Sequence, residues 1–321
     1  MSATPTGIGR RWLQWLALAL SLTGCAQFVP QTIALRGDWP SGVPRAIELR
    51  DVPFFPQTAY QCGPAALATT MNAAGAQVLP DDLVAQVYLP ARQGSLQLEM
   101  LAAPRRHGLV SWQIPPDYSS LLSELAAGHP VLVLQDLGIG PLRQWHYAVV
   151  VGFDYAAGDV VLRSGENQRQ VMPFTVFELT WRRSDYWAMV VTPPGVIPAN
   201  ATQASYLPAL LAFDRNATPQ AARTAWQAFL SRWPGHALAS LALGNRLYGE
   251  RNLTGAESVL RAGIQTHPAS TEMLNNLAQV LAEQGRNDEA LGVIERAAAQ
   301  PGSFAAEVAT TRAGILQRMA R

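Results

Sequence analysis

The pattern of hydrophobic and polar positions changes twice along the chain and divides it into three parts. An apolar run of about a dozen residues follows two N-terminal arginines and is too short to span a bilayer as an ordinary helix. Between residues 50 and 195, helical patterns alternate with apolar runs typical of buried strands. Beyond residue 203 the strand signals stop and helical patterns repeat. The 321-residue chain is therefore expected to form two folded domains behind an N-terminal leader.

A helix is predicted for the segment PAALATTMNAAG, which begins at Pro64. Leu67 and Met71 share one face of this helix, and Gly75 can end it. Cys62 therefore lies at or just before the helix N-terminus. Free N–H groups and the helix dipole at this position lower the pKa of a thiol, which favours a reactive cysteine over an inert one.

Composition excludes several kinds of chemistry. The chain has no lysine, so Schiff bases, Ser-Lys dyads and P-loop lysines are ruled out. A formal net charge of +1 without basic runs gives no sign of nucleic-acid binding. With 2 cysteines and no histidine cluster at metal spacing, a structural zinc site is excluded. We expect no cofactor and no metal.

The leader ends in Leu22-Thr23-Gly24-Cys25, which resembles the lipobox of bacterial lipoproteins. In that class the cysteine sulfur receives diacylglycerol and the peptide is cut before the cysteine, so residues 1–24 would be removed. Several acyl chains together give stable membrane anchoring. Ala26 after the cysteine favours the outer membrane, facing the periplasm. An uncleaved anchor or an ordinary signal peptide is the alternative.

A lipidated Cys25 would leave Cys62 without a disulfide partner, either as a buried inert thiol or as a nucleophile. A cysteine nucleophile needs a nearby base. Among the 5 histidines, His146 stands apart because it opens an apolar run, from Tyr147 to Phe153, that is typical of a core strand. The others fall at turn signals or in the repeats: His107, His129, His236 and His267. A hydrogen-bonded structural histidine is the alternative to a catalytic His146.

Two motifs carry a resemblance to a known family: QTAYQCGPA, which contains Cys62, and HYAVVVGFD, which begins at His146. In this order and spacing they resemble the bacteriocin-leader (double-glycine) peptidases, a papain-like cysteine peptidase family. The resemblance implies an α+β fold in which a helix with the nucleophile packs on an antiparallel sheet with the base. It also implies that Gln57 and the Cys62 N–H would hold the oxyanion.

The third catalytic position departs from the family. The family places Asp, within an Asp-Pro pair, at the end of the strand after the histidine strand, and the aligned residue here is Ser164. Counting hairpin pairs back from the preceding turn places residues near 167 opposite His146. We therefore expect Asn167 to orient the ring, with Ser164 as the second candidate.

The C-terminal part repeats with an offset of 34 residues, which matches Leu243 with Leu277 and Ala256 with Ala290. This pattern resembles tetratricopeptide repeats, an all-α solenoid of helix pairs. Such stacks have a concave groove that commonly binds a peptide or protein. The candidates to face it are Asn245, Asn276 and Gln279.

The expected organisation is a signal peptide (1–24), a linker from lipidated Cys25 (25–49), a papain-like domain (50–195), a linker (196–202), and repeats with a capping helix (203–321). Two functions fit it. One is an envelope-anchored cysteine peptidase whose repeats recruit a protein substrate or partner. The other is a lipoprotein scaffold in which a weak or inactive papain-like domain binds a peptide.

Overall fold

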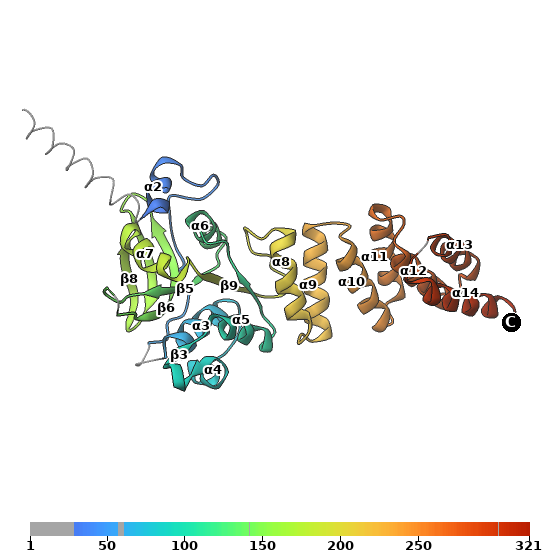
Figure 1. The fold of residues 1–321 in the computed structure, drawn as a ribbon, viewed down its shortest axis with the longest axis horizontal. Helices are drawn as coiled ribbons and strands as arrows, with labels where there is room; N and C mark the ends of the chain where they lie inside the picture. Colours follow the sequence, from blue (N-terminus) through green and yellow to red (C-terminus); the bar gives the residue numbers. More distant parts are fainter. Residues whose placement is uncertain (1–28, 57–60, 141, 301) are drawn as a thin grey trace, which may run out of the picture. The chain divides into compact units, whose positions relative to one another are not determined.

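The computed structural model describes residues 29–56, 61–140, 142–300 and 302–321 (Figure 1). Contacts divide the chain into two compact units: the N-terminal unit runs to Thr192 and includes Pro198–Ala201. The repeat unit comprises Pro193–Ile197 and Thr202–Arg321. Cys25 and the expected signal peptide lie outside the described residues. None of the helices in the described part is both long and apolar enough to cross a membrane.

The N-terminal unit is built on a seven-stranded antiparallel sheet. Its main path has the order β4-β9-β5-β6-β7-β8, and β1 pairs with β6 beyond the end of β5. The sheet strands are β1 Ala46–Glu48, β4 Val110–Gln113, β5 Val131–Asp136, β6 Trp145–Asp154, β7 Asp159–Ser164, β8 Asn167–Pro173 and β9 Ala188–Thr192. A separate two-residue hairpin pairs β2 Tyr88–Leu89 with β3 Gly94–Ser95.

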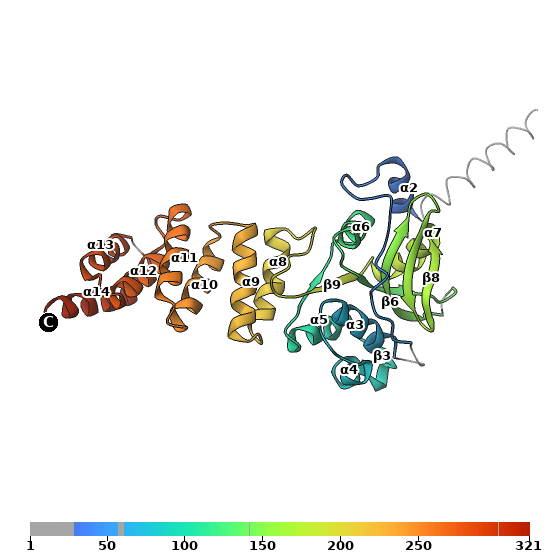
Figure 2. The same cartoon turned by 180° about the vertical axis from the view of Figure 1, so that it is seen from behind.

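Helices cover both faces of this sheet (Figures 1 and 2). On one face α3 packs its fully buried Leu67 and Met71 against Val149 and other strand residues. On the other face Gln135 of β5 donates a hydrogen bond to Thr180 of α7. The helices are α2 Pro30–Gly37, α3 Cys62–Ala73, α4 Pro80–Val87, α5 Gln97–Arg106, α6 Tyr118–Ala126 and α7 Phe174–Trp181, with short 3-10 turns η1 Pro90–Arg92 and η2 Arg182–Ser184. Successive side chains of a strand point to opposite faces, so the sheet has two apolar faces, and helices cover each of them.

The expected helix at Cys62 is present, and Gly75 follows its end with a φ of 94°. The buried face is wider than expected, because every residue from Gly63 to Met71 is buried. The following helix, α5, has Leu96 as its N-cap, and the preceding Ser95 lies in β3.

The described part of the segment expected to be a linker, residues 25–49, is folded onto the unit. The buried carboxylate of Glu178, on α7, accepts the backbone N–H groups of Gln31 and Thr32 at 3.0 and 2.7 Å and the Thr32 hydroxyl at 2.6 Å. These N–H groups open α2 and have no partner within the helix. Since β1 also pairs with β6, the linker expectation is wrong for these residues.

The repeat unit is all helical, as expected. Three helix pairs are followed by the single helix α14 Ala305–Met319: α8 Gln203–Asp214 with α9 Pro219–Arg232, α10 Ala237–Gly249 with α11 Leu253–Thr266, and α12 Thr271–Glu283 with α13 Asn287–Ala298. Ala222, Ala256 and Ala290, spaced 34 residues apart, are all fully buried. The small side chain at this position lets neighbouring helices approach closely. The structure thus confirms the α+β domain followed by a helical repeat array.

Candidate active site

Cys62 is the first residue of α3 and is half-buried. Its backbone N–H and that of Gly63 have no partner within the helix, because the first intrahelical bond runs from Ala65 to the Gln61 carbonyl. Gly63 is required here. A Cβ at that position would lie 2.2 Å from Ser95 Oγ, so only glycine lets β3 approach the start of the helix. The start of α3 is thereby held against β3 of the β2–β3 hairpin.

His146 is the second residue of β6 and is half-buried. Its Nε2 lies 2.9 Å from Ser164 Oγ, at the end of β7. This bond leaves Nδ1 as the ring nitrogen that can exchange a proton with a substrate or a thiol. His146 therefore has an orienting partner, and the partner is a neutral hydroxyl.

Asn167 does not hold the expected position. A two-residue turn, Gly165–Glu166, separates β7 from β8, and Gly165 has a φ of 59°. Asn167 consequently pairs with Ser164 at the start of β8 and is exposed. Among the described residues, no hydrogen bond joins it to His146. Asn167 was the first candidate to orient His146 and Ser164 the second, and the structure places Ser164 against the ring.

Burial dominates the protonation of both reactive groups. It raises the pKa of the Cys62 thiol, and hydrogen bonds from the backbone of Tyr147, Gly63 and Cys62 itself act in the opposite direction. Burial also lowers the pKa of His146. Both directions favour the uncharged form. In the described part of the chain no hydrogen bond joins the Cys62 sulfur to the His146 ring. The site therefore favours a neutral thiol and a neutral imidazole over an ion pair.

Both groups line one cleft of about 1010 Å³. The Cys62 sulfur also meets the backbone of Tyr147, the residue after His146, which brings the two side chains to adjoining positions on the wall. One side of the cleft is formed by residues 92–97 and the other by residues 143–147 with Gly165 and residues 183–185. This volume lies at the upper end of the range for ligand-binding clefts.

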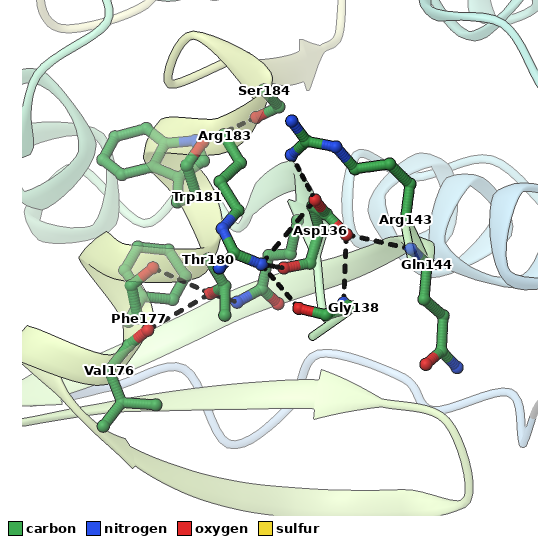
Figure 3. Close-up of polar contacts among 11 residues, drawn as sticks. Asp136, Gly138, Arg143, Gln144, Val176, Phe177, Thr180, Trp181, Arg183 and Ser184 are labelled. Carbon is green, nitrogen blue, oxygen red and sulfur yellow. Dashed lines mark hydrogen bonds and ion pairs between the residues drawn. The ribbon is translucent and has the colours of Figure 1, made fainter. Parts of the chain in front are cut away.

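A buried carboxylate behind the cleft was missed by the sequence analysis. Asp136 ends β5 and accepts the N–H groups of Gly138 and Gln144 at 3.0 and 2.9 Å and Arg143 Nη1 at 2.6 Å (Figure 3). Burial raises the pKa of this carboxyl, but these donors outweigh it and leave the pKa below its usual value. Arg183 Nη1 lies 3.7 Å away. The one available signal was an acidic residue closing a strand that begins with four apolar residues.

Gln57 and the three polar residues of the repeats are the remaining residues expected from the sequence. Gln57, the expected oxyanion donor, lies outside the described residues. In the repeats, Asn276 donates to Asn245 at 2.7 Å and Gln279 donates to Thr311 at 3.0 Å. These bonds link successive repeats, and the groove-facing role remains a prediction. No cluster of three metal-ligating side chains occurs within the ranges that the structure describes.

Comparison with known proteins agrees with this architecture. Residues 49–189 match the protein-family model described as the Peptidase_C39 like family, and residues 207–270 and 241–304 match the tetratricopeptide repeat. A crystal structure from Bacillus anthracis, described as C39-like, aligns at 15% identity with a TM-score of 0.40, covering 46% of this chain and 98% of that chain. No curated protein matches. The chain therefore combines a C39-peptidase-like domain with C-terminal tetratricopeptide repeats.

Proposed function

We propose that the N-terminal unit is a cysteine peptidase that hydrolyses peptide bonds in its cleft. The observation that carries this proposal is the joint placement of a helix-N-terminal thiol and a histidine with an orienting hydroxyl on the wall of one cleft. A nucleophile, a base and a group that orients the base are the parts that covalent acyl transfer requires.

Catalysis starts from the neutral pair. With Nε2–H donating to Ser164, the lone pair on Nδ1 takes the Cys62 proton as the sulfur bonds to the substrate carbonyl carbon. The Cys62 N–H, which has no partner within the helix, donates to the oxyanion of the tetrahedral intermediate, with the Gln57 amide as the expected second donor. The imidazolium then protonates the leaving amine. Water, deprotonated by His146, cleaves the thioester and regenerates the thiol.

Ser164 makes this site slower than one with a carboxylate. When His146 is protonated, a hydroxyl can accept its Nε2–H but contributes no opposite charge. The imidazolium that forms during attack is therefore less stabilised than it would be beside aspartate. We expect peptide turnover to be slow for the class.

A second function is supported by the same observation. A peptide-binding scaffold fits a site whose third member is neutral and whose thiol and imidazole make no hydrogen bond at rest. In this case the cleft holds a peptide without cutting it. The two functions differ in whether Cys62 forms a covalent bond.

The cellular role in our proposal comes from the parts outside the cleft. The lipobox-like sequence at Cys25 supports an anchored lipoprotein of the bacterial envelope, facing the periplasm. The tetratricopeptide repeats support recruitment of a protein substrate or partner. A recruited partner would raise the local concentration of peptide near the cleft.

The test is peptide cleavage by the full chain after the signal peptide. A complex peptide pool is incubated with wild type, Cys62→Ala and His146→Ala, and new termini are read by mass spectrometry. We expect cleavage by wild type and none above background in either variant. If all three proteins bound peptide without producing new termini, the peptidase function would be rejected in favour of the peptide-binding scaffold. New termini that persist in Cys62→Ala would reject the assigned nucleophile.

A further inference from the structure

Three arginines line the cleft from two sides. Arg92 lies on the β2–β3 hairpin. Arg143 lies just before the start of β6, and Arg183 lies in η2. The only carboxylate among the residues that line the described cleft is Asp185. Guanidinium groups bind carboxylates through paired N–H donors in a fixed geometry. The cleft therefore presents more positive than negative charge to whatever enters it.

Buried Asp136 holds two of these guanidiniums in place (Figure 3). Arg143 Nη1 contacts its carboxylate at 2.6 Å, and Arg183 Nη1 donates to the Gly138 carbonyl at 2.6 Å while lying 3.7 Å from the same carboxylate. In Figure 3 the two arginines approach Asp136 from different elements. One negative charge is thus shared by two positive ones.

Both guanidiniums keep binding capacity. The side chain of Arg143 is 55% exposed and that of Arg183 is 37% exposed, although Nη1 of each contacts Asp136. In the described ranges, neither uses its Nε or Nη2 in a hydrogen bond, and a guanidinium has five N–H donors. Arg92 has no ion pair within the same ranges. These free donors point to an anionic ligand, because the structural need to neutralise Asp136 is met by Nη1 contacts alone.

We propose that the cleft selects acidic peptides, with side-chain carboxylates of glutamate or aspartate bound by Arg143, Arg183 and Arg92. Asp136 is the positioning residue that holds the first two guanidiniums toward the ligand. This inference rests on the proposed use of the cleft for peptides and adds the chemical class of the peptide. An extended peptide can contact the arginines on both sides of the cleft.

The experiment measures binding separately from cleavage. The protein is the full chain after the signal peptide, with Cys62→Ala to prevent turnover. The probes are two fluorescein-labelled peptides of twelve residues, one containing four glutamates among leucine, alanine and glycine, and the other with glutamine at those four positions. Affinity is read by fluorescence anisotropy at low and high salt. We expect the glutamate peptide to bind about tenfold tighter at low salt, with the preference reduced at high salt.

Charge-removing variants identify the groups responsible. Arg92→Gln, Arg143→Gln and Arg183→Gln should each weaken the glutamate peptide by about two- to fivefold and leave the glutamine peptide unchanged. The matched control is Arg169→Gln. Arg169 is also 55% exposed and paired with a carboxylate, Glu48, but does not line the cleft. It should leave both affinities unchanged. Arg92→Gln removes no partner seen in the described structure, so it tests the proposal without disturbing Asp136.

Equal affinity for the two peptides, or a glutamate preference that survives all three substitutions, would overturn the inference. The inference would also be overturned if inorganic phosphate at low millimolar concentration, or phosphatidylglycerol vesicles, displaced the glutamate peptide from the protein. The arginines would then form a general anion site or a lipid site. Cleavage is read separately with wild type on the same two peptides. Selective binding of the glutamate peptide without cleavage would keep the selectivity for acidic peptides and reject the peptidase. Cleavage of both peptides without selectivity would do the reverse.

Discussion

The two units treat polar side chains in different ways. In the N-terminal unit, buried polar and charged residues lie throughout the core, among them Glu124, Asp136, Arg163 and Glu178. In the repeat unit, the buried polar residues among those described are Ser240 and Asn275. Buried charges must be paired or fully hydrogen-bonded. The first unit therefore depends on many specific polar contacts, and the second mainly on repeated apolar packing.

The reach of these contacts along the chain differs as well. Glu178 holds residues that are 146 and 147 positions away. In the repeats, bonds between neighbouring repeats span about one period: Arg246 reaches Asp214 across 32 residues and Tyr248 reaches Glu283 across 35. Long-range contacts give the first unit a cleft with chemistry. Contacts between neighbouring repeats let the second unit form a surface that grows with each added repeat.

The largest effect is expected from Glu178→Ala. It removes the acceptor of the Gln31 and Thr32 N–H groups and should cost about 3 kcal/mol, because buried donors lose their partner. Hydrogen–deuterium exchange should accelerate in peptides from α2 and α7. Repeat peptides should be unchanged. Unaltered protection of α2 would mean that apolar packing alone holds this helix, and would weaken the contrast between the units.

Ser164→Asp should convert the neutral pair into an ion pair. A carboxylate beside Nε2 is expected to raise the pKa of His146, since it stabilises the imidazolium. The alkylation rate of Cys62 at slightly acidic pH should rise about tenfold or more. Ser164→Asn is the neutral control and should not change it. Equal rates in all three proteins would show that Ser164 does not govern the charge of His146.

Smaller effects are expected in the repeats. Gly263→Ala places a Cβ 2.6 Å from the Met273 sulfur and 2.8 Å from Ser240 Cβ, and should cost about 1 to 2 kcal/mol by overpacking. Gly244→Ala is the matched change. Its Cβ meets one side chain alone, that of Leu260, with Cδ2 and Cγ both at 2.9 Å, and the aligned residue of the next repeat is Ala278. It should be nearly neutral, because better helix propensity offsets the contact. Urea unfolding monitored in the repeats checks both, and equal costs would contradict this reading.

The same contrast explains what could be predicted from the sequence. The repeats were predictable because their contacts recur at a fixed offset, as for Leu243 and Leu277. At the site, Cys62 and His146 followed from a helix start and a strand start, which are local signals. Ser164 came only second, because the Gly165–Glu166 turn that decides its place was not recognised. Asp136 was missed, since one of its partners, Arg183, lies on a different element 47 residues away.

The most direct test of the account is the rate at which iodoacetamide alkylates Cys62 as a function of pH, in the full chain and in His146→Ala. A thiol whose pKa is raised by burial is protonated at neutral pH, and its reactive thiolate appears only as pH rises above the ordinary value. The account predicts slow alkylation near pH 6 and 7, a rise above the ordinary thiol range, and the same profile without His146, while cleavage needs both residues. Fast alkylation near pH 6 that disappears in His146→Ala would contradict it, because the pair would then be ionised before substrate arrives.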